Sequence, residues 1–316
     1  MADIKTFGEQ VLENLEKVVV GKRQSLELIV IGLLCQGHVL IEDVPGVGKT
    51  MMARSLARSL DCSFNRIQFT PDMLPSDVTG VSIFNQQKRE FEFRPGPVIG
   101  QIILADEINR ATPKTQASLL EAMEERQVTV DGVTHALPKP FMVLATQNPI
   151  EYEGTFPLPE AQLDRFLLRV RMGYPTLPDE IRILEGQQLR HPIETLKSVV
   201  KGKDILASIE NVKKVYVSSA IKRYIVDLVS RSRQSDDVYL GASPRGSLAL
   251  FRTGQARAAL LDRDYVLPDD IQAMAVPVLG HRIIVGPAAR LREVSADRIV
   301  REIVDNLAVP GGDYRV

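Results

Sequence analysis

The segment VLIEDVPGVGKT, Val39 to Thr50, decides the fold of this 316-residue chain. A short apolar run ends in a bend rich in glycine and proline, and the helix-forming run from Met51 to Ala57 follows it. This order of strand, loop and helix is the layout of a P-loop, in which backbone N–H groups and a helix N-terminus surround phosphate oxygens. In such a loop Lys49 reaches the β- and γ-phosphates, and the Thr50 hydroxyl is a ligand for Mg²⁺.

The loop departs from the general pattern G-x-x-x-x-G-K-[ST] at its first position, where this chain has Asp43. An alternative interpretation is therefore a glycine-rich turn followed by an incidental Lys-Thr pair. Four further segments weigh against that alternative, because each lies where an enzyme with a P-loop carries a functional group.

The first of these segments is QIILADE, Gln101 to Glu107, an apolar run that ends in two carboxylates. The run predicts a buried parallel strand with Asp106 and Glu107 at its carboxyl edge. In P-loop NTPases the strand-terminal aspartate holds Mg²⁺, which is the role predicted for Asp106. Glu107 is then placed to orient or deprotonate the attacking water. The alternative is a helix N-terminus, where acidic residues are also favoured, and it is the weaker interpretation downstream of a P-loop.

The second segment is another apolar run, Phe141 to Gln147, which is followed by Asn148 and Pro149. Asn148 could contact the attacking water or the γ-phosphate. The alternative is a turn that ends the strand, because Asn-Pro is a common turn dipeptide. Considered by itself, this segment favours the turn.

The last two segments each contribute an arginine. Arg165 precedes the strand-like run 167–170 and is a candidate arginine finger, which stabilises charge on the transferring phosphoryl group and can be supplied in trans. Its alternative is a surface ion pair. Arg245 follows Ser243 and Pro244, which predict a helix N-cap and a first helical position. A cation in the first turn opposes the helix dipole, which suggests an anionic partner: an ATP phosphate or, alternatively, an ordinary carboxylate.

In this order, the segments resemble the AAA+ ATPases, and the MoxR family in particular, from about Glu9 to Asn306. Five motifs in this order are specific to AAA+ proteins. They are Walker A (Gly46 to Thr50), Walker B (Ile102 to Glu107), sensor 1 (Asn148), the arginine finger (Arg165) and sensor 2 (Arg245). The resemblance implies an α/β fold with a P-loop AAA+ core, a parallel sheet and hairpin insertions, followed by an all-helical lid domain. MoxR members often carry Glu-Asp-Val-Pro-Gly at the P-loop, so Asp43 departs from the general motif and not from the family.

The resemblance also implies the site. It implies an ATPase that converts ATP and water to ADP and phosphate, with Mg²⁺ as its metal. The residues implied to contact the nucleotide are Val20, Gly21, Pro45, Gly46, Val47, Gly48, Lys49, Thr50 and Met51. The implied metal ligands are Thr50 and Asp106, and the implied catalytic residues are Lys49, Glu107, Asn148, Arg165 and Arg245.

The chain is predicted to divide after residue 174, into a core over 1–174 and a helical lid over 175–316. Strand-like and helical patterns alternate in the first part, whereas the second is mostly helical in pattern. The predicted strands are 39–41, 64–69, 102–105, 142–145 and 167–170. Two insertions resemble MoxR features, one over about 70–97 and a hairpin over about 127–137, which contains the turn signal Asp131-Gly132. The hairpins could contact a remodelled substrate near a central pore or pack against a neighbouring subunit.

Charge and composition limit which partners and which cellular compartment are expected for this protein. A formal net charge of −1 gives no global electrostatic case for binding nucleic acid. No apolar run approaches the roughly 18 residues of a membrane span, and no secretory signal is recognisable, so we expect a cytoplasmic protein without a membrane span. Cys35 and Cys62 suit a reducing compartment. The four histidines show no metal-ligand spacing.

If Arg165 acts in trans, the subunits must form a ring or an open helical array, and the AAA+ resemblance favours a hexamer. The resemblance implies a chaperone that remodels or matures partner complexes, with von Willebrand factor A domain proteins as partners. The alternative function is a nucleic-acid motor or DNA-dependent regulatory ATPase of the related helix-2-insert group. The charge, the lack of an appended DNA-binding module and the lack of a Gly-Ala-Phe-Thr-Gly-Ala loop argue against it. A scaffold with negligible turnover is a third possibility, against which Glu107 argues.

Overall fold

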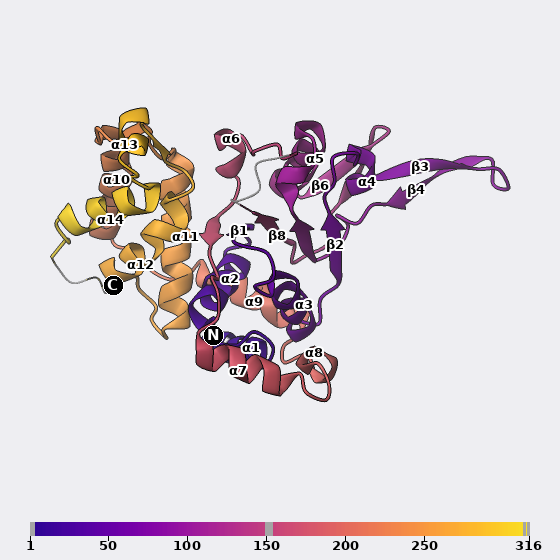
Figure 1. The fold of residues 1–316 in the computed structure, drawn as a ribbon, viewed down its shortest axis with the longest axis horizontal. Helices are drawn as coiled ribbons and strands as arrows, with labels where there is room; N and C mark the ends of the chain where they lie inside the picture. The colour runs from indigo at the N-terminus through magenta and orange to yellow at the C-terminus, as the bar shows by residue number, and fades with distance from the viewer. Residues whose placement is uncertain (1–3, 149–153, 312–313, 315–316) are drawn as a thin grey trace. The chain divides into compact units, whose positions relative to one another are not determined.

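The computed structural model describes residues 4–148, 154–311 and 314 (Figure 1). The chain forms two compact units, which we call the sheet unit (Gln10–Leu158 and Val170–Leu206) and the helical unit (Met1–Glu9, Pro159–Arg169 and Ala207–Val316). This division differs from a single cut after residue 174. Residues 175–206 cluster with the sheet unit, and residues 159–169 cluster with the helical unit.

A five-stranded sheet with strand order β2-β5-β8-β1-β9 organises the sheet unit, although the first two residues of its edge strand β9 cluster with the helical unit. Its strands are β1 (Val39–Glu42), β2 (Phe64–Gln68), β5 (Ile102–Asp106), β8 (Met142–Gln147) and β9 (Leu168–Val170). The pairings of β1 with β8, β8 with β5 and β5 with β2 are parallel, and all five residues of β5 are buried. The α/β fold and the five predicted strands are confirmed, since near-continuous apolar runs are typical of parallel strands covered on both faces.

Helices supply the crossovers that parallel strands require. The helices within the sheet unit are α2 (Arg23–Leu34), α3 (Lys49–Ser59), α4 (Pro75–Thr79), the 3-10 helix η1 (Ile108–Arg110), α5 (Pro113–Glu125), α7 (Leu177–Gly186) and α8 (Pro192–Thr195). Helices α2, α3 and α7 lie below the strands in Figure 1, whereas α4 and α5 lie above them. Two more helices, α1 (Ile4–Glu16) and α9 (Gly202–Val212), run from one unit into the other.

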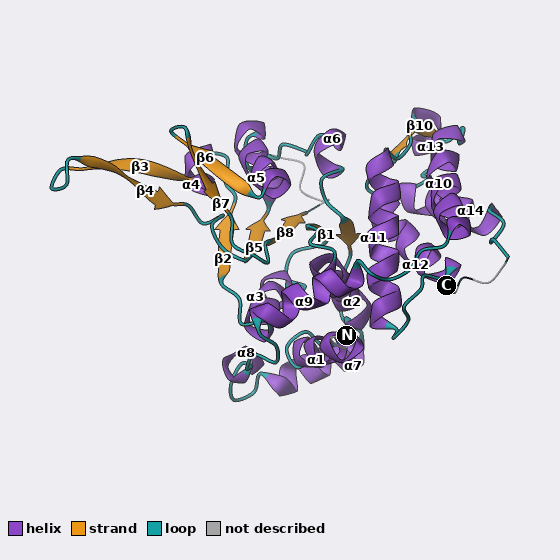
Figure 2. Cartoon of the chain, turned by 180° about the vertical axis from the view of Figure 1, so that it is seen from behind, coloured by secondary structure: helices purple, strands orange, loops and turns teal. Residues whose placement is uncertain are grey.

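Two hairpins project from the sheet unit, as Figure 2 shows. One pairs β3 (Gly80–Asn85) with β4 (Glu90–Pro95), and the other pairs β6 (Gln127–Val130) with β7 (Val133–Ala136). The second turns at Asp131-Gly132, where both residues have a positive φ, as a two-residue hairpin turn requires. The Phe93 and His135 rings stack with centroids 3.9 Å apart and so connect the two hairpins. The predicted hairpin insertions are confirmed.

The helical unit is built from longer helices. Its elements are α6 (Glu160–Leu163), α10 (Ser219–Gln234), α11 (Pro244–Leu260), α12 (Pro268–Leu279), α13 (Pro287–Leu291), α14 (Ala296–Asn306) and a two-stranded antiparallel ribbon of β10 (Val238–Leu240) and β11 (Ile284–Val285). Ser218, Ser243 and Ser295 are N-caps whose side chains accept backbone N–H groups. The predicted helical domain is thus present, with a short ribbon that the helical patterns did not indicate. Within the described residues, no helix combines the length and apolar character needed to cross a bilayer.

Candidate functional site

The predicted site residues fall into two groups, one in each unit. The P-loop, Asp106, Glu107 and Asn148 belong to the sheet unit, whereas Arg165 and Arg245 belong to the helical unit. Within the sheet unit, the P-loop follows β1, the two carboxylates end or follow β5, and Asn148 follows β8. Because these three strands are parallel neighbours, their carboxyl ends lie at one edge of the sheet.

The loop between β1 and α3 has the backbone of an anion-binding cradle. Gly46 and Gly48 have φ values of 85° and 87°, a left-handed conformation that side chains disfavour. A Cβ placed on either glycine would meet no atom within 4 Å, so open space lies beside the backbone at both positions. Gly48 is the N-cap of α3, and no side chain caps that helix. The loop and the helix N-terminus therefore fit the phosphates of a nucleotide.

Lys49 and Asp43 are connected across this loop. Lys49 Nζ donates to the Asp43 backbone carbonyl at 2.8 Å, which folds the ammonium group back over the loop. The buried Asp43 carboxylate accepts the N–H groups of Val44 at 2.9 Å, Met172 at 2.5 Å and Gly173 at 2.6 Å. Asp43 thus fixes the start of the P-loop to the chain that leaves β9. This contact explains why an aspartate replaces the glycine of the general motif.

Asp106 is held on both of its oxygens. Its Oδ1 accepts the Thr146 hydroxyl at 2.7 Å, and its Oδ2 accepts Arg66 Nη2 at 2.6 Å and Nε at 3.1 Å. Arg66, whose side chain is 47% exposed, is not among the residues predicted from the sequence. Arg66 lies on β2, whose register opposite β5 brings the guanidinium to this edge of the sheet.

Glu107 has a left-handed backbone, with φ of 56° and ψ of 50°, where a residue other than glycine is strained. Its backbone N–H donates to Thr146 Oγ1 at 2.8 Å. Its Oε2 accepts Gln68 Nε2 at 2.8 Å and Arg110 Nε at 3.0 Å. A strained backbone persists only where surrounding contacts hold it in place, and such strain is common at active sites. Gln68 is a further group that the sequence did not predict. Its only sequence signal is that it lies two residues after Arg66, on the same face of β2.

The donor set at this edge fits Mg²⁺ in the way that nucleotide-binding enzymes hold it. Among the described residues, no group of three or more His, Cys, Asp or Glu side chains could hold a metal ion. Mg²⁺ is commonly bound by one or two carboxylates together with phosphate oxygens and water, and needs no all-protein cage. Asp106 and the Thr50 hydroxyl are the protein ligands that such a site would use.

Val20 and Gly21 lie in the segment between α1 and α2. Gly21 has a φ of 72°, a left-handed conformation that favours glycine, and a Cβ on it would come within 2.2 Å of the Asp179 carboxylate, which would have to move. Lys22 Nζ donates to the Tyr174 carbonyl at 2.7 Å. The chain that leads into α7 therefore contacts this segment. Its predicted contact with the nucleotide stays a prediction.

In the helical unit, Arg165 and Arg245 lie on segments that hydrogen bonds connect. Ser243 Oγ donates to Asp164 Oδ2 at 2.8 Å and accepts the Arg245 backbone N–H at 3.1 Å. Pro244 is at the first helical position of α11, as predicted, and the first turn contains no acidic residue.

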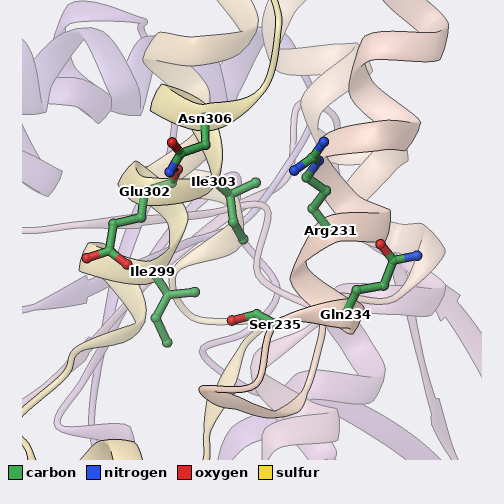
Figure 3. Close-up of a pocket in the computed structure, with 7 residues that line it drawn as sticks. All are labelled: Arg231, Gln234, Ser235, Ile299, Glu302, Ile303 and Asn306. Carbon is green, nitrogen blue, oxygen red and sulfur yellow. The ribbon is translucent and has the colours of Figure 1, made fainter.

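A groove elsewhere in the helical unit contains none of the predicted site residues. It has a volume of about 290 Å³ and lies between α10 and α14 (Figure 3). The lining residues are Arg231, Gln234, Ser235, Ile299, Glu302, Ile303 and Asn306.

Comparison with known proteins agrees with this geometry. Residues 38–168 match the ATPase family associated with various cellular activities (AAA), and residues 230–303 match the AAA lid domain. Chaperone MoxR1 of Mycobacterium tuberculosis is 39% identical over 98% of this chain and 84% of its own length. This chain belongs to the MoxR family of AAA+ ATPases.

Two further proteins match nearly the whole length of this chain. YeaC of Bacillus subtilis is 56% identical, over 98% of this chain and 96% of that protein. A crystal structure from Cytophaga hutchinsonii superimposes with a TM-score of 0.91 at 38% identity, covering 98% of this chain and 96% of the other. The fold is therefore shared over essentially the whole length. The family predicted from the sequence is confirmed by the match to Chaperone MoxR1.

Proposed function

We propose that this protein is a Mg²⁺-dependent, ATP-hydrolysing chaperone of the MoxR type that remodels or matures partner protein complexes. The observation that carries the proposal is the shared edge of the sheet. Three neighbouring parallel strands bring their polar groups to that edge. The groups are the glycine cradle and Lys49 after β1, Asp106 and Glu107 at the end of β5, and Asn148 after β8. Parallel α/β sheets bind ligands outside the carboxyl ends of their strands.

The residues of the sheet unit bind the nucleotide and its metal. The P-loop residues Pro45 to Met51, with Lys49, bind the phosphates, and Val20 and Gly21 contact the rest of the nucleotide. Thr50 and Asp106 hold Mg²⁺, which, when bound, neutralises charge on the phosphates.

The other polar groups act on the reaction. Glu107 orients or deprotonates the attacking water, and Asn148 positions it or the γ-phosphate. Arg245 contacts a phosphate of the bound nucleotide, and Arg165 acts on the nucleotide of a neighbouring subunit. Because a finger supplied in trans needs a head-to-tail interface, we propose a closed homo-oligomeric ring, a hexamer.

The chaperone role and its partners rest on family membership, and the relative named Chaperone MoxR1 supports it. We propose that the clients are protein complexes, that von Willebrand factor A domain proteins cooperate with the ring, and that it acts in the cytoplasm. A formal net charge of −1 supports protein clients over nucleic acid.

ATP turnover of matched variants tests the proposal. Lys49→Ala removes the charged side chain of the loop and should abolish tight Mg-ATP binding. Glu107→Gln keeps the shape and removes the base, so ATP should still bind while turnover falls by about two orders of magnitude or more. Glu121→Gln, on the exposed side of α5, is the control and should match the wild type. Equal loss of binding and turnover in Glu107→Gln would contradict its assignment as the base.

The same Glu107→Gln protein, loaded with ATP, should retain client complexes that the Lys49→Ala protein does not. Quantitative mass spectrometry of the two captures identifies the clients by their difference. If DNA stimulates ATP turnover and the captured proteins do not, the result would favour the nucleic-acid motor instead.

A further inference from the structure

Asp164 precedes Arg165 in the chain, and hydrogen bonds connect it to the start of the helix that bears Arg245. Its Oδ2 accepts the Ser243 hydroxyl at 2.8 Å, and its Oδ1 accepts Arg282 Nε at 2.8 Å. Ser243 Oγ also accepts the backbone N–H of Arg245 at 3.1 Å. One carboxylate and one hydroxyl therefore connect the residue before Arg165 to the first turn of the helix that bears Arg245.

The chain that follows Asp164 is fixed at further points. The side chain of Arg282, which is 3% exposed, donates to the backbone carbonyls of Phe166 and Leu167. His281 Nε2 lies 3.0 Å from the same Phe166 oxygen, and the Phe166 side chain is fully buried. Burial lowers the pKa of Arg282 to about 10, an effect that Asp164 opposes, so Arg282 stays a cation at neutral pH. The turn that bears the finger is thus anchored within the helical unit.

We propose that Asp164 is a positioning residue for ATP hydrolysis, which holds Arg165 and Arg245 at a fixed spacing on one body. Both guanidinium groups are then presented to nucleotide phosphates together and move together. The inference rests on the proposed function, because it takes both arginines to act on phosphate. A displacement of about 1 Å in a group that acts on the transition state can lower turnover about a hundredfold, so a shared anchor matters for rate.

A purely structural role is the competing explanation. Ser243 would then serve only as the N-cap of α11, and Asp164 only as the counter-ion of a buried arginine. Such a role lowers the stability of the helical unit when either group is removed. It does not by itself change turnover in protein that remains folded.

The chain offers a matched control. Ser295 caps α14 in the same unit by accepting the Arg298 N–H at 3.2 Å. Ser295→Ala therefore removes an equivalent cap without touching Asp164. We expect Ser243→Ala and Asp164→Asn to lower kcat at least about tenfold while the Kd for ATP changes less than about twofold, by the misplacement argument. Ser295→Ala should keep the kcat of the wild type, and Ser243→Thr, which retains the hydroxyl, should recover most of it.

Hydrogen exchange without nucleotide gives a readout that does not depend on activity. The Arg165 and Phe166 amides donate to the Gln162 and Leu163 carbonyls at 3.2 and 3.1 Å. The Ser243→Ala substitution leaves the ion pair between Asp164 and Arg282 intact. Exchange of the two amides should nevertheless accelerate in Ser243→Ala and stay unchanged in Ser295→Ala.

The outcomes separate the two proposals. Unchanged exchange in Ser243→Ala, or a kcat equal to that of Ser295→Ala, would overturn the role of Asp164. A wild-type protein without ATP turnover would instead overturn the proposed function, and the exchange rates would still decide whether Asp164 anchors the turn. If Asp164→Asn does not fold, the comparison of the two serine variants decides alone.

Discussion

Acidification should destabilise this protein through one buried imidazole, that of His38. The ring lies in the core of the sheet unit, where Nδ1 accepts the Val143 N–H at 3.0 Å and Nε2 lies 3.0 Å from the Met123 carbonyl. Because Nδ1 is an acceptor, the proton is on Nε2 and the ring is neutral. Burial lowers the pKa of His38 from 6.5 to about 4, the bond to Met123 opposes this, and the nearby Arg126 charge adds to it.

The sign follows from the order of the two pKa values. The unfolded chain binds a proton near pH 6.5 and the folded ring only near pH 4, so the contribution is fully present above pH 6.5 and is lost as the pH falls towards 4. At about 1.4 kcal/mol for each pH unit, the full loss is about 3 kcal/mol in the free energy of unfolding. That is a large fraction of the stability of a typical domain.

Urea unfolding followed by circular dichroism at several values between pH 7.5 and 4.5 measures this loss. His38→Gln cannot titrate, so the stability difference between wild type and variant should shrink as the pH falls. His281, whose pKa burial also lowers, titrates in both proteins and cancels in the difference. A parallel loss of stability in the two proteins, or an NMR titration of His38 near its ordinary pKa, would refute the reasoning.

Three further perturbations act on the candidate site. Asp43→Asn keeps the shape but loses the charge that three backbone N–H groups share, so unfolding free energy should fall by about 1–3 kcal/mol and calorimetry should show weaker ATP binding. Arg66→Ala removes the cation beside Asp106, so half-maximal turnover should need less Mg²⁺; an unchanged or higher requirement would contradict this. Arg165→Ala should bind ATP without turning it over, and mixing it with Lys49→Ala should restore activity. No rescue at any ratio, together with a specific activity that does not depend on concentration, would show that Arg165 acts within its own subunit or is a structural ion-pair residue.

Local patterns were sufficient for the fold. Apolar runs predicted the five strands, Asp131-Gly132 predicted a hairpin turn, and Ser243-Pro244 predicted the start of α11. Each depends on residues that are adjacent in the chain, so the sequence alone contains the signal. The order of motifs along the chain was sufficient for the family.

The contacts that hold the site were not predictable in this way. Arg66 and Gln68 reach the two carboxylates only because β2 pairs with β5 in one register, with Gln68 opposite Asp106. Asp164 meets Ser243 across 79 positions of the chain. The role of Asp43 similarly depends on a chain segment more than a hundred residues away. Such partners follow from tertiary packing, for which a single sequence without relatives contains no direct signal.

The two units alternate along the chain, and this limits how the protein can be recombined. Residues 159–169 and 207–316 belong to one unit, yet residues 170–206 of the other lie between them. Consider a chimaera in which residues 1–174 of this chain are joined to the remaining residues of a relative. It would pair the native turn at Phe166 with the relative's counterparts of Ser243 and Arg282. A functional exchange of the lid between MoxR proteins must therefore move both segments together, so sequence change in the two should be correlated across the family.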